Sequence, residues 1–589
     1  MKRTLFAFAT LAVAVVMVLG LAQPAFSQVT AAQAQLNGTV KDQAGGVIVK
    51  ATVTLKNVDT NHVYTTTTNG DGFYILANIP PGNYELSAEF TGFGKAVQKD
   101  VVLRVAQVAT IDISLKVAAA TEVVEVKTEA PVIEPTRTEV SQVVATEQIQ
   151  ALPISGRLFT DFALLSPGVT TGRISLQSTF TDPSTTRISF GGQRDLSNSV
   201  TVDGADNINS ATGSQRATPS QEAVSEFRVV NNSFGAEYGR ALGGIVNIVT
   251  KSGTNDLHGS VYEYFQNNAV NAKSILTQPG FDILRQNQFG ATLGGPIRKD
   301  RTFFFMNYEG QRRGQSPTYP ALLVNNLVAI NALKASLGIA PENLGVLKTA
   351  DVDNGFIKLD HQLNEANRLS VRYLIQDATN LNMLVGDTLD GGGVGAPSSG
   401  RNGLLRDQSL DGTLTTQLSN TKVNSLLVQW ARRNYGFPGV TGQPNLDVPN
   451  LLLLGHNFGA FDRYNETRLQ FSDTYSMISG NHFAKFGVDT NYIRNFVIWP
   501  GFTPARVIFP SLGDLLVSGK SNWGSAPCPP PLIGLTAPCL AAFFWGAPIG
   551  PGPFNPNAAS PSVPTTWQNA FLPSQASNFN VNLNHSYIG

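Results

Sequence analysis

The sequence predicts a predominantly all-β protein made of three successive folded parts. Of its 589 residues 55 are Gly and only 14% are charged, a composition that favours strands and turns over long helices. Short runs in which apolar and polar residues alternate, bounded by turn residues, recur from residue 36 onward. Beyond residue 27 no apolar run approaches the ~20 residues of a membrane helix, whereas the mean hydropathy of -0.03 fits alternating strands.

Charge and cysteine content exclude two classes of protein. Lys plus Arg and Asp plus Glu number 42 each, so no net positive field marks the chain as a nucleic-acid binder. With two Cys in so long a chain, stability comes from burial and strand pairing rather than from a disulfide framework.

The N-terminus predicts export. Lys2 and Arg3 precede an apolar run from Leu5 to Ala22, and small residues follow up to Ser27. We interpret residues 1–27 as a signal peptide that is cleaved after Ser27. The alternative is an uncleaved anchor, because the run is close to the length of a spanning helix.

Residues 36–117 predict a small β-sandwich. Strand-like runs at 51–55, 64–68, 73–76 and 84–90 are separated by strong turn signals, at Asn69 to Gly72 and at Pro80 to Asn83. About 80 residues are enough for such a module to fold alone. Asp71 has no companion carboxylates for calcium, so we interpret it as part of a hairpin turn.

Three segments of this module stand out: Gly38-Thr39-Val40, Thr68 to Tyr74, and Pro81 to Tyr84. Together they resemble the carboxypeptidase regulatory-like domain. The resemblance implies a prealbumin-like β-sandwich, an architecture shared with carbohydrate-binding folds, so glycan contact is one role that it implies. The module lacks zinc ligands and no catalytic domain accompanies it, so no peptidase activity is expected.

Residues 118–135 read as a linker that contains one short strand. Glu122-Val123-Val124-Glu125-Val126 alternates apolar and acidic residues, and Pro131 and Pro135 follow. Two interpretations remain open: the last strand of the sandwich, or an extended peptide that adds to the sheet edge of a partner.

Residues 136–253 predict a mixed α+β domain. The spacing of apolar residues from Ile149 to Leu165 predicts a short helix, stopped by Pro167 and Gly168. Strands follow at 188–192, 199–202, 224–230 and 243–253. Asp203-Gly204 predicts a tight turn after the second of them.

Four motifs follow one another in this domain: Leu152-Pro153, Pro167-Gly168-Val169, Val202-Asp203-Gly204 and Gly243 to Gly253. Their order resembles the plug of TonB-dependent receptors, most closely the Oar-like branch, which places a carboxypeptidase regulatory-like domain ahead of the plug. The resemblance implies that residues 122–126 are a TonB box, which pairs with a periplasmic TonB-type energy-transducing protein. Where many plugs carry Arg-Gly, this chain has Ser189-Phe190-Gly191-Gly192-Gln193-Arg194, so the ligand contacts of siderophore receptors are not carried over.

Residues 254–589 predict part of a transmembrane antiparallel β-barrel. Alternating hairpins at 288–309, 357–375, 410–432 and 469–492 have short turns on one side and long irregular loops on the other. A soluble sandwich also alternates, but the loop asymmetry favours the membrane, as do aromatic residues near strand ends: Tyr308, Tyr373, Trp430 and Tyr492. About nine strands are recognisable against 22 in the family. The barrel is therefore expected to be incomplete, because an open sheet edge is costly in lipid.

No catalytic or metal site is predicted. The six His lack metal-protease spacing, no P-loop or nucleophile motif has a fitting context, and no cofactor is expected. Cys528 and Cys539 lie in a Pro-rich stretch that the topology places outside the cell, where we expect a local disulfide.

Two functions from different classes remain. The first is an outer-membrane receptor that binds an extracellular solute and moves it into the periplasm. The second is a surface binding protein or adhesin that holds glycan or matrix without transport. A plug has no purpose in a pure adhesin, so the sequence favours transport; it does not indicate the solute.

Overall fold

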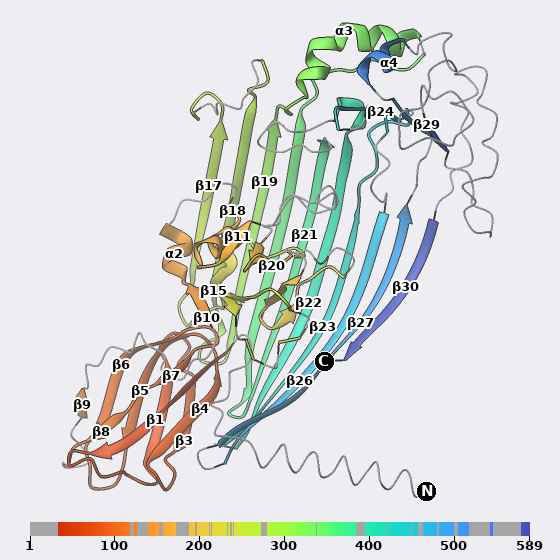
Figure 1. Cartoon of the computed structure of the whole chain (residues 1–589). Helices are drawn as coiled ribbons and strands as arrows, with labels where there is room; N and C mark the ends of the chain where they lie inside the picture. The colour runs from red at the N-terminus through yellow and green to blue at the C-terminus, as the bar shows by residue number, and fades with distance from the viewer. Residues whose placement is uncertain are drawn as a thin grey trace, which may run out of the picture.

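The computed structural model describes residues 33–117, 123–125, 140–151, 157–171, 188–517 with short gaps, 542–545 and 579–588. The predicted signal peptide lies outside these residues. Figure 1 shows a small sandwich, a compact middle unit and a tall curved sheet that wraps around it. Across the part of the chain that is described, no helix has the length and apolar character to cross a membrane.

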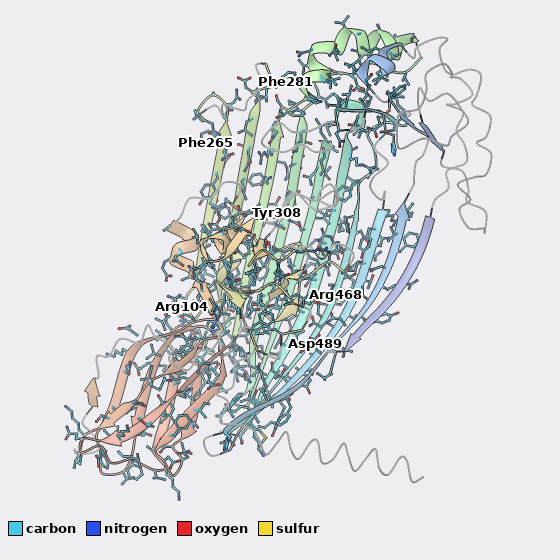
Figure 2. The ribbon with its side chains drawn as sticks, viewed as in Figure 1. Arg104, Phe265, Phe281, Tyr308, Arg468 and Asp489 are labelled. Carbon is cyan, nitrogen blue, oxygen red and sulfur yellow. The ribbon has the colours of Figure 1, made fainter. Side chains whose placement is uncertain are left out.

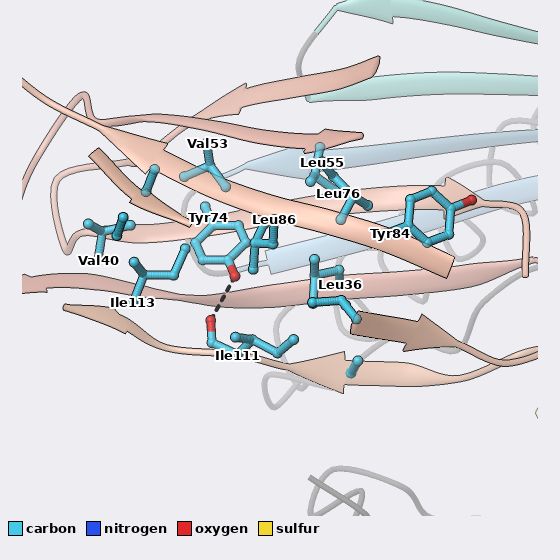
Figure 3. Packing of buried hydrophobic residues seen from close by; sticks show 14 of the residues in the cluster. Leu36, Val40, Val53, Leu55, Tyr74, Leu76, Tyr84, Leu86, Ile111 and Ile113 are labelled. Atoms are coloured by element: carbon cyan, nitrogen blue, oxygen red, sulfur yellow. Dashed lines mark hydrogen bonds between the residues drawn. The ribbon is translucent and has the colours of Figure 1, made fainter. Parts of the chain in front are cut away.

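The front unit is a β-sandwich, as predicted. One sheet has the order β3 (Val63–Thr67), β2 (Thr52–Asn57), β5 (Gly82–Glu89), β6 (Lys95–Leu103) and β9 (Val123–Glu125). In the other, β1 (Ala34–Asp42) pairs with β4 (Phe73–Ile79), β7 (Val108–Thr110) and β8 (Ile113–Leu115). Alternate residues of both sheets fill the core between them, and the buried Tyr74 hydroxyl donates to the Ile111 carbonyl at 2.7 Å (Figure 3).

The predicted hairpin at Asn69 to Gly72 is wrong in its topology. The Asn69 side chain accepts the N–H groups of Asp71 at 3.0 Å and Phe73 at 2.9 Å, which builds a turn. However, β3 pairs with β2 whereas β4 pairs with β1, so the turn carries the chain from one sheet to the other. Local turn chemistry does not distinguish a hairpin from a crossing between sheets.

The middle unit, here called the plug, has a five-stranded mixed sheet. Its order is β10 (Val140–Val144), β15 (Val224–Asn232), β16 (Ile245–Thr250), β13 (Ser199–Val202) and β14 (Ala205–Asp206). A separate ribbon pairs β11 (Val169–Thr171) with β12 (Ile188–Phe190). Buried apolar side chains of these strands form one core together with the helical turns.

The single helix predicted up to Leu165 is wrong. Two short segments occur instead, α2 (Thr146–Ala151) and the 3-10 helix η2 (Phe159–Leu165), followed later by η5 (Gln221–Ala223). Leu158, with ψ of 87°, breaks the helical path ahead of η2. The end before Pro167 is as predicted.

The tall sheet, here called the wall, has ten antiparallel strands in chain order. They are β17 (His258–Asn267), β18 (Leu284–Arg298), β19 (Thr302–Gln315), β20 (Lys348–Asn364), β21 (Asn367–Met383), β22 (Arg401–Ser419), β23 (Lys422–Gly436), β26 (Arg463–Ser479), β27 (His482–Trp499) and β30 (Phe579–Ile588). Turns next to the sandwich are short, as at 299–301 and 365–366, whereas the connections at the far end are long. The predicted loop asymmetry is confirmed.

Alternation along the wall strands is also as predicted. Outer-face residues such as Val261 (88% exposed) and Phe265 (65%) are apolar and open, whereas Asp360 (4%) and Arg372 (3%) of the inner face are covered by the plug. The strands run further than predicted at their far ends. There the outer face carries polar residues such as Asp353 and Arg406, while Val352 and Leu405 are buried on the inner face, so the alternation seen further along each strand changes its phase.

The far connections are not irregular, which corrects a further prediction. They contain α3 (Ala321–Ser336), η6 (Pro397–Ser399), α4 (Leu512–Val517) and a small sheet of β25 (Leu452–Leu454), β24 (Asn445–Val448), β28 (Ala505–Ile508) and β29 (Ala542–Trp545). Residues of α3, α4, β24, β25 and the adjoining connections share an apolar core, here called the cap, at the end opposite the sandwich (Figure 1). Its residues come from separate connections, so no single stretch carries a period that reveals it.

Candidate functional site

The Val202-Asp203-Gly204 motif forms a tight turn between β13 and β14, as predicted. Val202 pairs with Ala205, and the two residues between them have positive φ, 48° at Asp203 and 88° at Gly204. This is the backbone of a two-residue hairpin, which Asp-Gly adopts at little cost. The Asp203 side chain accepts the Thr250 N–H at 2.9 Å and the Thr250 hydroxyl at 2.6 Å, so the turn is fastened to β16.

Asp203 also joins the plug to the wall. Its Oδ2 lies 3.6 Å from Lys358 Nζ and 3.4 Å from Arg372 Nη1, and Arg372 in turn binds Asp411 at 2.5 Å. Burial alone raises the pKa of Asp203, but Lys358, Arg372 and the Thr250 hydrogen bonds outweigh it and lower that pKa. Asp203 is therefore ionised at neutral pH, and its charge is matched from the wall.

A second ionic cluster lies further from the sandwich. Arg216 of the plug binds Asp407 of β22, and Arg433 of β23 binds the same carboxylate at 3.1 Å. Arg468 of β26 reaches back to Asp206 of the plug at 2.6 Å and lies within the wall at the level of the plug (Figure 2). Every one of these side chains is at most 7% exposed.

A third contact is centred on Arg157 of the plug, beside η2. Its guanidinium binds Glu222 at 2.7 Å and lies 3.7 Å from Glu309 of β19. It also stacks over the ring of Tyr264 in β17, 4.1 Å from the centroid, which adds a cation–π contact. By contrast, the apolar contact cluster between the plug and the wall is small: Ala223, Phe305, Phe356 and Leu374.

The plug and the wall meet mainly through charged and polar groups. The inner face of the wall and the plug surface present charges and amides to each other. Among the residues that the structure describes, no three His, Cys, Asp or Glu side chains come together as a metal-binding group.

The sandwich meets the plug and the wall near the short turns. A cavity of about 370 Å³ lies at this junction, lined by residues of all three units, among them Tyr84, Glu226 and Arg368. Arg104 lies at the same junction (Figure 2). Burial lowers the pKa of His62, which also lines the cavity, to about 4, so this imidazole is neutral at neutral pH.

The predicted coupling segment is described only at Val123–Glu125, and Glu122 and Val126 lie outside the described residues. Val123–Glu125 forms β9, which runs parallel to β6 at the edge of the sandwich, with Val123 opposite Lys95 and Glu125 opposite Val97. This is the place that one of the two open interpretations expects. Cys528 and Cys539 lie outside the described residues, and their disulfide remains a prediction.

Sequence reasoning missed the ionic clusters. The signal was present, since Asp407, Arg433 and Arg468 fall at positions of alternating strands that face the same side. Their partner Arg216 could not be found in the same way, because it lies in a stretch with no regular pattern.

Two family models match the chain. One is described as outer membrane beta barrel domain and matches residues 249–327 and 321–548, and the other, carboxypeptidase regulatory-like domain, matches residues 35–116. The first covers 300 of the 589 residues, half of the chain. The chain therefore belongs to the outer-membrane β-barrel family, and its place is the outer membrane of a Gram-negative cell.

One curated relative is the TonB-dependent transporter Oar of Myxococcus xanthus. It is 29% identical over 287 residues, which are 46% of this chain and 26% of that protein. The chain thus spans about a quarter of this relative. The predicted resemblance to Oar-like TonB-dependent receptors with a regulatory-like domain is confirmed.

Solved structures of similar proteins include the outer-membrane transporter YddB of Escherichia coli, with 13% identity, a TM-score of 0.46, and 63% of this chain and 50% of that one covered. Another is the siderophore receptor PirA of Acinetobacter baumannii, with 17% identity, a TM-score of 0.43, and 61% and 48% covered. This chain spans about half of each.

Proposed function

We propose that this chain acts in an outer-membrane receptor that binds an extracellular solute and admits it to the periplasm, driven by a periplasmic TonB-type protein. One observation carries the proposal: a separately folded plug occupies the inner face of the wall and is held there by ion pairs and hydrogen bonds. A permanent filling would be packed with apolar side chains, as protein cores are. Polar contacts can instead be exchanged for water when the plug moves.

The domain boundaries belong to the same proposal. They are a signal peptide at 1–27, a sandwich at 36–117, a linker at 118–135, a plug at 136–253 and barrel strands at 254–589. In this arrangement the short turns face the periplasm, and the sandwich beside them does too. Its place supports a role in coupling rather than in holding glycan outside the cell.

We further propose that the segment 122–126 receives the energy-transducing partner. Among the residues that the structure describes, β9 is an edge strand that pairs with β6 and with no other strand. A second strand can add to its other side by backbone hydrogen bonds. Val124→Pro removes one N–H donor and bends the strand, whereas Val124→Ala keeps the backbone, so the first abolishes uptake and the second only weakens it.

A surface-binding role without transport is the second candidate. The observation that favours it is the cap, which has its own core and a buried ion pair between Lys334 and Glu342 at 2.5 Å. Such a rigid outer platform suits contact with glycan or matrix. It suits capture of a solute equally well, and it gives no reason for a plug.

The test compares periplasmic extracts by untargeted mass spectrometry, from cells that express the receptor, Val124→Ala or Val124→Pro in rich medium. We expect at least one medium solute to accumulate with the receptor, less with Val124→Ala, and none with Val124→Pro or after a protonophore. Accumulation that survives both treatments overturns energised transport. The second candidate is favoured if cells without the receptor adhere less to glycan or matrix while their periplasmic solutes are unchanged.

A further inference from the structure

The loop between β6 and β7 fastens the sandwich to the plug. Arg104 to Gln107 form a turn, in which the Gln107 N–H donates to the Arg104 carbonyl at 3.1 Å and the Gln107 side chain accepts the Arg104 N–H at 2.8 Å. Ala106 has φ of 51°, a left-handed conformation. Val105, at the turn, is fully buried.

Arg228 of β15 binds this turn and the neighbouring plug strand together. Its Nη1 donates to the carbonyls of Val105, at 3.1 Å, and Ala106. Its Nε donates to the Ser141 hydroxyl of β10 at 2.8 Å. Arg228 is only 1% exposed, so one buried guanidinium links the sandwich to the two plug strands β15 and β10.

Glu226 secures the same turn two residues earlier on β15. Its Oε1 accepts the Val105 N–H, and its Oε2 lies 3.5 Å from Arg104 Nη1. Both backbone groups of Val105 are therefore engaged by the plug. We call the contact of Glu226 and Arg228 with the 104–107 turn the clasp.

A second contact ties the sandwich to the wall. Asn61, in the β2–β3 connection, donates to Asp300 Oδ1 at 2.9 Å, and Asn255 donates to the same oxygen at 2.7 Å. The Asn255 N–H also donates to the Asp59 carbonyl at 2.9 Å. The sandwich is thus held in one orientation from two sides.

We propose that the sandwich is a force lever, and that a pull on β9 reaches plug strand β15 through β6 and the clasp rather than through the linker. This rests on the proposed function. Force enters at β9, passes to β6 through their shared ladder, and β6 ends at Leu103, directly before the clasp. The pull therefore acts on β15, the second strand of the plug sheet, as well as on its edge.

The linker is a poor alternative route. Fourteen residues, 126–139, separate β9 from β10. Such a segment lengthens to about 50 Å at full extension. Without the clasp, a pull on β9 would reach the plug only along these fourteen residues, at its edge strand β10.

The first measurement asks whether the two contacts hold the sandwich. Spin labels at Asp71→Cys and Glu365→Cys, both exposed, report the distance between sandwich and wall in receptor from outer membranes, with Cys528 and Cys539 replaced by Ser. Proline cannot take the positive φ of Ala106, so Ala106→Pro should disrupt the clasp. Together with Asp300→Ala, which removes the contact to the wall, it makes the undocked variant. In that variant the single narrow spin-label distance should become a broad distribution. The matched control, Ala106→Gly with Asp300→Asn, keeps the backbone and one carbonyl acceptor and should stay narrow.

The second measurement asks whether the lever moves the plug. Ala223 is fully buried between plug and wall, so Ala223→Cys should react with fluorescein maleimide only when the plug moves. In energised cells in rich medium we expect labelling to fall at least fivefold in the undocked variant and to persist in its control.

Labelling that is unchanged in a variant shown to be undocked overturns the lever. So does a narrow distance in that variant, because the clasp would then not hold the sandwich. Failure of the proposed function looks different: labelling of the wild-type background is then the same with and without a protonophore.

Discussion

The interior of the plug and its outer surface are built on opposite principles. Fifteen buried apolar residues from α2, η2 and the strands make up the interior that the structure describes. The rings of Phe227 and Phe159 meet edge to face there, with their centroids 5.6 Å apart. Against the wall, the same unit presents Asp203, Arg216 and Arg157, each matched by an opposite charge. Among the residues that the structure describes, the apolar contact cluster with the wall has four members.

In the transport cycle proposed above, this difference allows the plug to stay folded while it leaves the wall. Apolar burial is lost whenever the interior opens, so the interior keeps the plug folded. Ion pairs and hydrogen bonds are largely replaced by water when the plug slides out, so the net cost of leaving is far below their gross strength. We infer that the plug moves as a folded body.

Phe227→Ala should have the largest effect, because it cuts the interior. Phe227 is fully buried, and such a truncation typically costs about 3–5 kcal/mol. We expect the amide protons of the plug to exchange faster while those of the wall strands stay protected. Hydrogen exchange in outer-membrane preparations measures this difference. Equal protection in both units would contradict the comparison.

Asp407→Asn should come next, because it cuts the outer surface. It leaves Arg216 and Arg433 buried beside a neutral amide, and an uncompensated buried charge costs about 3 kcal/mol. The expected result is a plug that stays folded but labels more readily at Ala223→Cys. The double change Asp407→Leu with Arg433→Met should recover most of the plug's attachment, since it removes one charge of each sign and leaves Arg216 beside Glu466.

The clasp should depend on pH through Glu226. Burial raises the pKa of Glu226 to about 7, although Arg104, the Val105 N–H and Arg228 each lower it. Glu147 also lies 3.9 Å from Arg104. Release of the sandwich exposes the carboxyl and returns its pKa towards the ordinary 4.5. The docked state therefore binds the extra proton, so docking is firmest below pH 4.5 and weakens as pH rises through 7.

The distribution of spin-label distances should accordingly be narrower at pH 5.5 than at pH 8. The proton makes docking more favourable by about 2–3 kcal/mol at most. Glu226→Gln keeps an acceptor for Val105 and should abolish this pH dependence while leaving the sandwich docked at pH 8. If the wild-type sandwich is released more at pH 5.5 than at pH 8, protonation of Glu226 does not control its docking.

Arg406→Ala should have the smallest effect. Arg406 pairs with Asp377 through two hydrogen bonds of 2.7 Å, but both side chains are open to solvent on the outer face. Exposed pairs contribute less than about 1 kcal/mol. Thermal unfolding and Ala223→Cys labelling should both be unchanged, and a large loss would mean that charge pairs matter on either face of the wall.

The sequence predicted the parts of this fold that rest on local patterns. Alternation at Ile357, Leu359 and Leu363 revealed β20, and Asp203-Gly204 revealed a turn whose φ angles are both positive. The sheet crossing at Asn69 could not be predicted, because the same turn chemistry serves both topologies. The cap could not either, since Leu323, Leu452 and Phe509 come from three separate connections.

The candidate site was predicted only at its turn. Val202, Asp203 and Gly204 were identified, but the role of Asp203 depends on Lys358 and Arg372, which lie more than 150 residues away. The clasp rests on the backbone of Val105, which carries no signal in its side chain. Contacts to backbone groups, and pairs of residues far apart in the sequence, cannot be predicted from the sequence because they depend on the three-dimensional fold.

Two cysteines test most directly whether the plug leaves as a folded body. Ala223 lies on the plug surface against Phe305 and Phe356 of the wall, whereas Val229 lies in the plug interior, and both are buried in the seated state. In energised cells treated with fluorescein maleimide, Ala223→Cys should label and Val229→Cys should stay unlabelled, and a protonophore should abolish the difference. Equal, energy-dependent labelling at both positions would mean that the plug unfolds in place, and would contradict the account.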